Sequence, residues 1–121
     1  MIEGLVSLAR VLYDSWQSAP SLAGFRGASE HRLLCFEFEG GGVDLQIAPD
    51  PARAGRFWVN GEVRGVAPCA VRSQSGGAAE QETQTDADGY FEFETVPGSL
   101  MLTLVAARGM IQVGPIQIGT R

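Results

Sequence analysis

From residue 31 to residue 118, apolar side chains recur at every second position, and Gly, Pro or Asp residues interrupt the pattern about every 8 to 12 residues. This alternation gives an extended strand one apolar and one polar face, whereas an amphipathic helix needs apolar residues three and four positions apart. Several short strands separated by turns are typical of a β-sandwich. The pattern therefore predicts an all-β domain of seven or eight strands.

The same alternation predicts the core and the pairing of individual strands. The segment RLLCFEFEG and the following VDLQIAP alternate on either side of a glycine turn, which predicts a hairpin. We expect a bulge at Asn60–Gly61 within one long strand, and a polar edge strand in EQETQT. The expected core includes Phe36, Phe38, Leu45, Phe91, Phe93, Leu102 and Leu104.

Residues 1–30 form an N-terminal arm that precedes the domain of residues 31–121. Five apolar residues of the arm fall at helical spacing, but three helix breakers follow them, so both a helix and an extended segment are open. The apolar residues are Ile2, Leu5, Ala9, Leu12 and Trp16, and the helix breakers are Pro20, Gly24 and Gly27. Together with Tyr13 and Phe25, the arm carries too much apolar area to leave in water. We expect part of it to pack on the sandwich, with Trp16 near a sheet.

The segment TDADGYFEFETVPG offers a choice between a metal loop and a turn. With Asp86 and Asp88 at positions 3 and 5 of an EF-hand loop, Gly89 takes position 6. Position 1 is then Gln84 and position 12 is Thr95, so the bidentate acid is missing. We expect a hairpin turn at Asp88–Gly89, with glycine at positive φ, and we expect neither a metal nor another cofactor.

Charge and composition exclude several partners. The net charge is −5, and all nine basic residues are scattered arginines, which argues against nucleic acid. No apolar run approaches the roughly 20 residues of a membrane span, and Glu3 and Arg10 disrupt any secretory signal. Cys35 and Cys69 fit no zinc or redox spacing and are expected to be buried, unpaired thiols. The sequence therefore predicts a cytoplasmic protein without a membrane or nucleic-acid partner.

Four large aromatic residues are the candidate binding residues: Tyr13, Trp16, Trp58 and Tyr90. Tyr and Trp are enriched at interaction hot spots because each combines a large apolar ring with a polar atom. Trp58 alternates away from its neighbours and should face outward, although a small second core under the arm is the alternative. Glu37, Glu39, Glu92 and Glu94 form either an acidic face for a basic partner or an ordinary solvated surface.

The segment TDADGYFEFETVPGSLMLTLV resembles the C-terminal half of carboxypeptidase regulatory-like domains, and VNGEVRGVAPCAVRSQSG more loosely resembles their opening strands. This resemblance covers residues 57 to about 107 and implies a prealbumin-like, transthyretin-type β-sandwich. It implies little about function, since such domains accompany many unrelated proteins. The segment from VLYDSW to VDLQI more faintly resembles small bacterial proteins encoded near alternative sigma factors.

Catalytic signatures are missing. Transthyretin-like hydrolases of 5-hydroxyisourate use paired His and Arg residues and a Tyr-Arg-Gly-Ser tail, whereas this chain has one histidine, His31, and ends in QIGTR. We therefore expect no enzyme. The expected function is a non-catalytic interaction or regulatory module with a protein partner, which could be a second copy. The alternative is a carbohydrate- or small-ligand-binding domain that uses Trp58 and Tyr90.

Overall fold

The computed structural model describes residues 6–16, 31–76, 79–107 and 109–119. Within these ranges the chain forms ten strands and no helix, and two of the strands come from the arm. In chain order the strands are β1 (Val6–Leu8), β2 (Arg10–Asp14), β3 (Arg32–Phe38), β4 (Gly41–Pro49), β5 (Phe57–Arg64), β6 (Ala70–Ser75), β7 (Gln81–Gln84), β8 (Tyr90–Thr95), β9 (Gly98–Ala106) and β10 (Gly109–Ile118). The predicted all-β class is confirmed.

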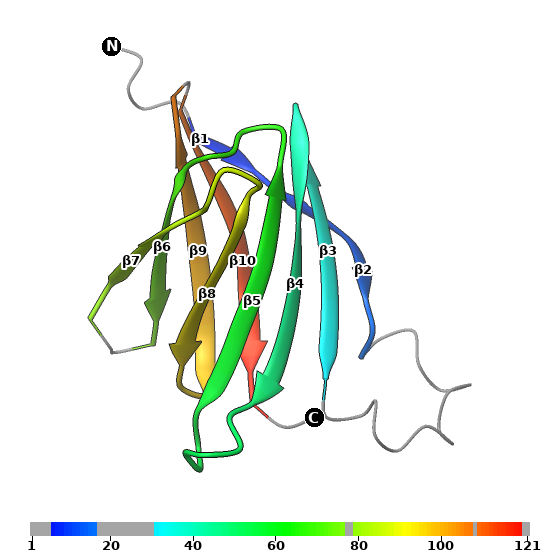
Figure 1. The fold of residues 1–121 in the computed structure, drawn as a ribbon. Coiled ribbons are helices and arrows are strands. Elements are labelled where there is room, and N and C mark those ends of the chain that lie inside the picture. The colour runs from blue at the N-terminus through cyan, green and yellow to red at the C-terminus, as the bar shows by residue number, and fades with distance from the viewer. Residues whose placement is uncertain (1–5, 17–30, 77–78, 108, 120–121) are drawn as a thin grey trace.

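The strands pair into two five-stranded sheets (Figure 1). Sheet I has the order β1-β10-β9-β6-β7, and sheet II has the order β2-β3-β4-β5-β8. Every pair is antiparallel except β1 with β10, which is parallel. The predicted hairpin is present, because β3 pairs with β4 from Arg32↔Ile47 to Phe38↔Gly41.

A single hydrophobic core lies on the inner faces of the two sheets. Alternate residues of each long strand contribute to it, as in β3, where Leu34, Phe36 and Phe38 are buried. The core residues expected from the alternation are all buried: Phe36, Phe38, Leu45, Phe91, Phe93, Leu102 and Leu104. Burial of these side chains is the main source of stability in a domain of this kind.

The bulge expected at Asn60–Gly61 was wrong. Strand β5 pairs with β4 in one unbroken register from Gly42↔Arg64 to Pro49↔Phe57. The glycine has a different purpose, because a Cβ atom at Gly61 would lie 2.3 Å from Cζ of Phe91. Gly61 therefore makes room for an aromatic ring of the neighbouring strand.

The turn at residues 86–89 does not join a hairpin, because it leads from β7 in sheet I to β8 in sheet II. Its local chemistry is nevertheless that of the predicted turn. One carboxylate oxygen of Asp86 accepts hydrogen bonds from the backbone N–H groups of Asp88 (2.9 Å) and Tyr90 (3.0 Å). Gly89 has φ +93° and donates its N–H to the Asp86 carbonyl. The Asp86 side chain thus holds the turn.

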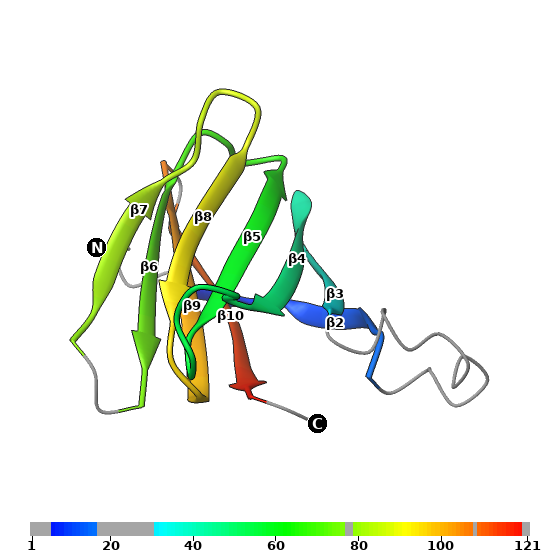
Figure 2. The same cartoon turned by 60° about the horizontal axis from the view of Figure 1, so that its bottom comes forward.

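The chain passes between the two sheets at the connections β1–β2, β5–β6, β7–β8 and β8–β9 (Figures 1 and 2). On one side β1 of sheet I continues through Ala9 into β2 of sheet II, and on the other side β8 follows β7. The arm is therefore extended over residues 6–14, and the helical alternative is wrong there. Ile2, Leu5, Pro20, Gly24, Phe25 and Gly27 lie outside the described residues.

No helix long and apolar enough to cross a membrane occurs in the part of the chain that the structure describes.

Candidate functional site at the apolar edge

Exposed apolar side chains gather at the side of the molecule formed by the arm. Among the described residues, seven large hydrophobic side chains are exposed, and six of them belong to β1, β2 or β3. These six residues, here called the apolar edge, are Val6, Leu8, Val11, Leu12, Tyr13 and Leu33. Leu8 is 73% exposed and Leu12 is 58% exposed, so the sandwich covers little of either side chain.

The strand pairing explains how the apolar edge wraps around the sandwich. In β1, Ser7 pairs with the buried Ile111, so Val6 and Leu8 lie on the opposite, outer face of sheet I. In sheet II, Tyr13 pairs with Cys35. Because Leu33 is two residues from Cys35 on β3, Tyr13 and Leu33 lie on the same face of the sheet. Among the described strands, β2 is the edge strand of sheet II and pairs only with β3.

A buried ion pair anchors the end of the arm to the sandwich. The Arg32 guanidinium donates to both carboxylate oxygens of Asp14, from Nε at 3.1 Å and from Nη2 at 2.8 Å. Its Nη1 donates to the Gln117 carbonyl at 2.5 Å, which links the pair to β10. The Arg32 and Asp14 side chains are only 11% and 9% exposed. The ion pair therefore ties the end of β2 to β3 and β10.

Trp16 takes part in the same anchor. The Arg32 guanidinium carbon lies 4.0 Å from the centroid of the indole ring, and the backbone N–H of Trp16 donates to the Asp14 carboxylate at 3.1 Å. A cation over the face of an indole ring is an attractive arrangement. As expected, Trp16 lies near a sheet, and there it contacts the arm's own ion pair. Tyr13 is 42% exposed and contributes to the apolar edge instead.

The other two candidate aromatic residues lie elsewhere on sheet II. Trp58 on β5 is half-buried and pairs with Glu94, whereas Tyr90 on β8 is 53% exposed and pairs with Glu62. Glu94 follows Tyr90 by four positions, so the Trp58 and Tyr90 rings are spaced by about 13 Å along the strands. Strands β3 and β4 separate both from β2. The structure thus divides the four candidate residues into two pairs.

Trp58 is next to a cluster of charged groups. Glu94 accepts hydrogen bonds from Arg53 at 2.8 Å and from Arg56 at 3.4 Å. Asp50 is buried. Two hydrogen bonds hold the pKa of Asp50 below its usual range: one with the Glu94 side chain, which has the larger effect, and one from the Ala52 N–H. The cluster fixes the loop between β4 and β5 beside Trp58.

The four glutamates proposed as an acidic face do not form one. Glu37 on β3 pairs with Arg10, and Glu94 on β8 pairs with Arg53 and Arg56. Glu92 lies on β8, separated from β3 by two strands. Glu39 follows β3 and lines a cavity at the end of the sandwich. Two of these four charges are thus compensated, and the set is dispersed.

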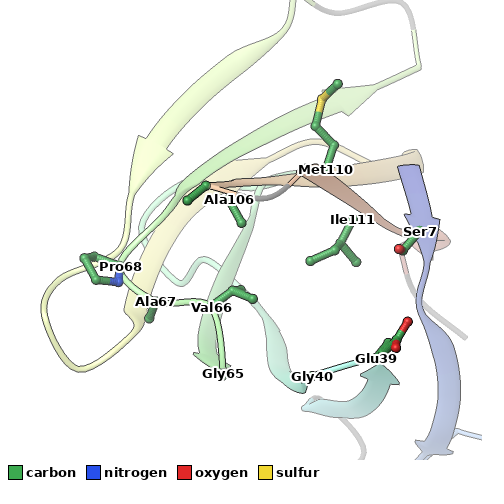
Figure 3. Close-up of a pocket in the computed structure, with 12 residues that line it drawn as sticks. Ser7, Glu39, Gly40, Gly65, Val66, Ala67, Pro68, Ala106, Met110 and Ile111 are labelled. Carbon is green, nitrogen blue, oxygen red and sulfur yellow. The ribbon is translucent and has the colours of Figure 1, made fainter. Parts of the chain in front are cut away.

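The cavity near Glu39 has a volume of about 860 Å³. Its walls come from Ser7, the turn after β3, the loop between β5 and β6, and the facing ends of β9 and β10 (Figure 3). Most lining residues are Gly, Ala, Val, Pro, Met or Ile, and Glu39 is the only charged residue among the described ones. A Cβ atom at Gly65 would lie 2.0 Å from the Gly40 carbonyl oxygen, so the glycine allows two of the walls to meet.

The histidine and the two thiols of this chain are the side chains to consider for nucleophilic catalysis. His31 and Glu39 flank opposite ends of β3, separated by about 25 Å of extended chain, and the His31 ring contacts Gln46. Cys69 is buried and Cys35 half-buried, and burial raises the pKa of both thiols. A raised pKa lowers the fraction of reactive thiolate. Groups of three or more His, Cys, Asp or Glu side chains suited to a metal ion are absent from the described ranges.

No family model matches this chain, and comparisons with curated proteins and with solved structures also give no match.

Sequence reasoning identified part of the apolar edge. Tyr13 was a candidate and Leu12 was counted among the arm's apolar residues, but Val6, Leu8, Val11 and Leu33 were missed. The available signal was the uninterrupted run Val11-Leu12-Tyr13, which fits neither an alternating strand nor one face of a helix. The helical spacing of other apolar residues in the arm suggested a helix and outweighed this run.

Proposed function

We propose that this chain is a non-catalytic protein-interaction module with a prealbumin-like β-sandwich fold, and that a protein partner binds its apolar edge. The observation that carries the proposal is the concentration of six of the seven exposed large hydrophobic side chains around β1 and β2. A concentration of exposed apolar side chains on one part of a small domain suggests an interaction site, because leaving such surface in water is costly.

The contrast between the two sides of the sandwich supports this assignment. The opposite edge strand of sheet I, β7, has the sequence Gln-Glu-Thr-Gln and exposes polar side chains. Polar and charged residues at an edge discourage association with other chains. Among the described strands, those of the arm and the adjacent β3 therefore present most of the exposed apolar side chains that gain free energy when they are covered.

The resemblances described above suggest the setting of this interaction. A carboxypeptidase regulatory-like domain is an accessory domain, and proteins encoded near alternative sigma factors belong to bacterial signalling or transcription control. We therefore propose a regulatory role in the bacterial cytoplasm, exerted by binding and not by catalysis.

The substitution Leu12→Asp tests the proposed site. It places a charge in the middle of the apolar edge, where an interaction hot spot loses at least about 1.4 kcal/mol, or tenfold in affinity. We expect tagged wild-type protein to capture specific partners from the native host and the variant to capture at least tenfold less. Because Leu12 is 58% exposed, the melting temperature should hardly change.

Gln84→Asp is the matched control, since it adds the same charge to exposed β7 on the opposite side of the sandwich. This variant should capture partners as the wild type does. Equal capture by the Leu12 and Gln84 variants would contradict binding at the apolar edge.

A second candidate function is the binding of a carbohydrate or another small ligand on the outer face of sheet II. Trp58 and Tyr90 favour it, because both lie on this face, on adjacent strands. If this candidate is right, binding on a glycan array should disappear with Trp58→Ala and persist with Tyr13→Ala, each variant being checked for an unchanged circular dichroism spectrum. Binding that tolerates the loss of the Trp58 indole would exclude this face.

A further inference from the structure

We infer that residues 6–16 form a strap that opens and closes as one unit on the folded sandwich, and that the apolar edge exists only while the strap is closed. The strap consists of β1, Ala9, β2, Ser15 and Trp16. This inference rests on the function proposed above and describes how its site is regulated. It is carried by the burial of the strap, by the contacts that hold it and by the way in which the apolar edge is assembled.

The strap contributes almost nothing to the hydrophobic core. All three residues of β1 are exposed, and β2 has four exposed residues followed by one half-buried residue. A longer strand such as β3 instead alternates between buried side chains and exposed or half-buried ones. Among the described hydrophobic residues of the strap, only Ala9 packs against the core. Because apolar burial is the main source of stability, opening the strap gives up much less than unfolding the sandwich.

Backbone hydrogen bonds hold the two halves of the strap, and both ladders are short or interrupted. Strand β1 pairs with β10 in parallel over three residues, and Ala9 then donates its N–H to the Gln112 carbonyl at 2.9 Å. Strand β2 pairs with β3, but the register shifts between Val11 and Tyr13. Water replaces such hydrogen bonds when a segment opens, so each of them contributes only modestly to the closed state.

The buried ion pair gives the closed strap a defined position. Asp14 at the end of β2 contacts Arg32 of the sandwich, and the Trp16 ring lies against the same guanidinium. Opening returns the Asp14 carboxylate to water and uncovers Arg32, and the hydration of both charges offsets much of the attraction that is lost. The pair therefore specifies where the strap docks, without making its opening as costly as the removal of one partner by mutation.

The connection between the two halves of the strap makes them open together. Only Ala9 separates β1 from β2, and the two strands run as one extended segment from sheet I to sheet II (Figures 1 and 2). A parallel pairing of three residues is too short to hold β1 in place once β2 has been released. Release of β2 therefore frees the whole strap, as expected for a cooperative unit of the native state.

The apolar edge depends on the closed strap, because five of its six residues lie on the strap and Leu33 alone lies on the sandwich. When the strap opens, the five side chains leave Leu33 and no longer form a fixed surface. The edges of β3 and β10, which pair with the closed strap, become free at the same time. A partner that binds the apolar edge thus binds the closed form and shifts the equilibrium towards it.

The first test is hydrogen exchange of single backbone amides in the full chain, followed by NMR. Ala9 donates its N–H to sheet I and Ser15 donates to the Leu33 carbonyl of sheet II, so these two strap amides report on the two ends of the strap. The amide of the buried Val63, which donates to the Gly89 carbonyl, reports on the sandwich. After correction for intrinsic rates, we expect both strap amides to exchange at least about tenfold faster than Val63 and within about tenfold of each other.

Either of two results in this test would overturn the inference. If the strap amides exchange less than about tenfold faster than Val63, the strap opens only when the whole domain unfolds. If the rates of Ala9 and Ser15 differ by more than about tenfold, the strap frays at one end instead of opening as a unit.

The second test closes the strap covalently. In a Cys35→Ser background, Arg10→Cys and Glu37→Cys replace two residues that are directly opposite each other on β2 and β3. Opposite residues on antiparallel strands are close enough for a disulfide. In the oxidised form, both strap amides should exchange at least about tenfold more slowly relative to the sandwich amide. The reduced form of the same protein is the matched control, and equal rates in the two forms would contradict opening of the strap.

The same clamped protein tests the regulation of the site, because residues 10, 35 and 37 are not part of the apolar edge. The oxidised form should capture host partners at least as well as the reduced form, since every molecule then presents the closed edge. Weaker capture by the oxidised form would mean that the partner binds the open form, which would overturn the inferred regulation.

Failure of this inference is separable from failure of the proposed function. If the strap amides exchange independently of Val63 but neither the wild type nor the oxidised form captures a partner, the strap opens as inferred and the proposed function is wrong. If Leu12→Asp loses the partners but the strap amides exchange only as slowly as Val63, the proposed function stands and the strap inference is wrong.

Discussion

Replacing Phe91 by alanine should lower the free energy of unfolding by about 3 to 5 kcal/mol, the usual cost of removing a large aromatic side chain from a core. Phe91 is 6% exposed, and its ring stacks on Phe93 with the ring centroids 6.2 Å apart. The substitution removes these contacts and leaves a cavity between the sheets. Urea denaturation followed by circular dichroism measures the loss. A change below about 1 kcal/mol would mean that the ring is not in the core.

The contact between Phe91 and Gly61 provides an internal control for this prediction. A Cβ atom at Gly61 would lie 2.3 Å from Cζ of Phe91, so Gly61→Ala should destabilise the wild type by forcing the ring aside. In the Phe91→Ala background the ring is gone and the same substitution should cost much less. The two changes should therefore be strongly non-additive in a double-mutant cycle. Additive effects would show that Gly61 is required for some other reason.

Replacing Arg32 by methionine should also cost about 3 to 5 kcal/mol, because it leaves the buried carboxylate of Asp14 without its cation. Arg32 joins the arm to β10 as well, through its hydrogen bond to the Gln117 carbonyl. Urea denaturation should show the loss of stability. Quenching of tryptophan fluorescence by an added quencher should also rise, because the Trp16 ring loses the guanidinium that covers it.

Two comparisons make the Arg32 prediction specific. Arg64→Met breaks the exposed pair with Asp44, in which the side chains are 49% and 44% exposed, and should cost below about 1 kcal/mol. Combining Arg32→Met with Asp14→Leu removes both buried charges and should recover part of the stability. If the double variant is as unstable as Arg32→Met alone, an uncompensated Asp14 charge is not the cause of the loss.

The core of the sandwich was predictable because burial follows from a local pattern. On an extended strand the side chains alternate between the two faces, so the positions of Phe36, Phe38, Phe91 and Phe93 along the chain already indicate that they face inward together. The Asp86–Gly89 turn was predictable for a similar reason, since its hydrogen bonds join residues at most four positions apart.

The apolar edge was less predictable because it depends on contacts between distant parts of the chain. Extended conformation alone does not say which strand a segment joins. Here Val6 pairs with Met110 and Val11 pairs with Phe36, across long stretches of intervening chain. Leu33 joins the same surface only because β3 pairs with the arm. The exposure of these side chains is a consequence of where their strands lie in the two sheets.

Between residues 31 and 118, local patterns therefore indicate most of the strands, turns and core, because they depend on backbone geometry within a few residues. Three features required the tertiary structure: the path of the arm from one sheet to the other, the place of Gly61 beneath a ring, and the buried pair of Asp14 with Arg32. Each depends on two segments that meet only after the sheets have assembled. Their free energy comes from packing and charge compensation across that distance, which the spacing of residues along the chain does not encode.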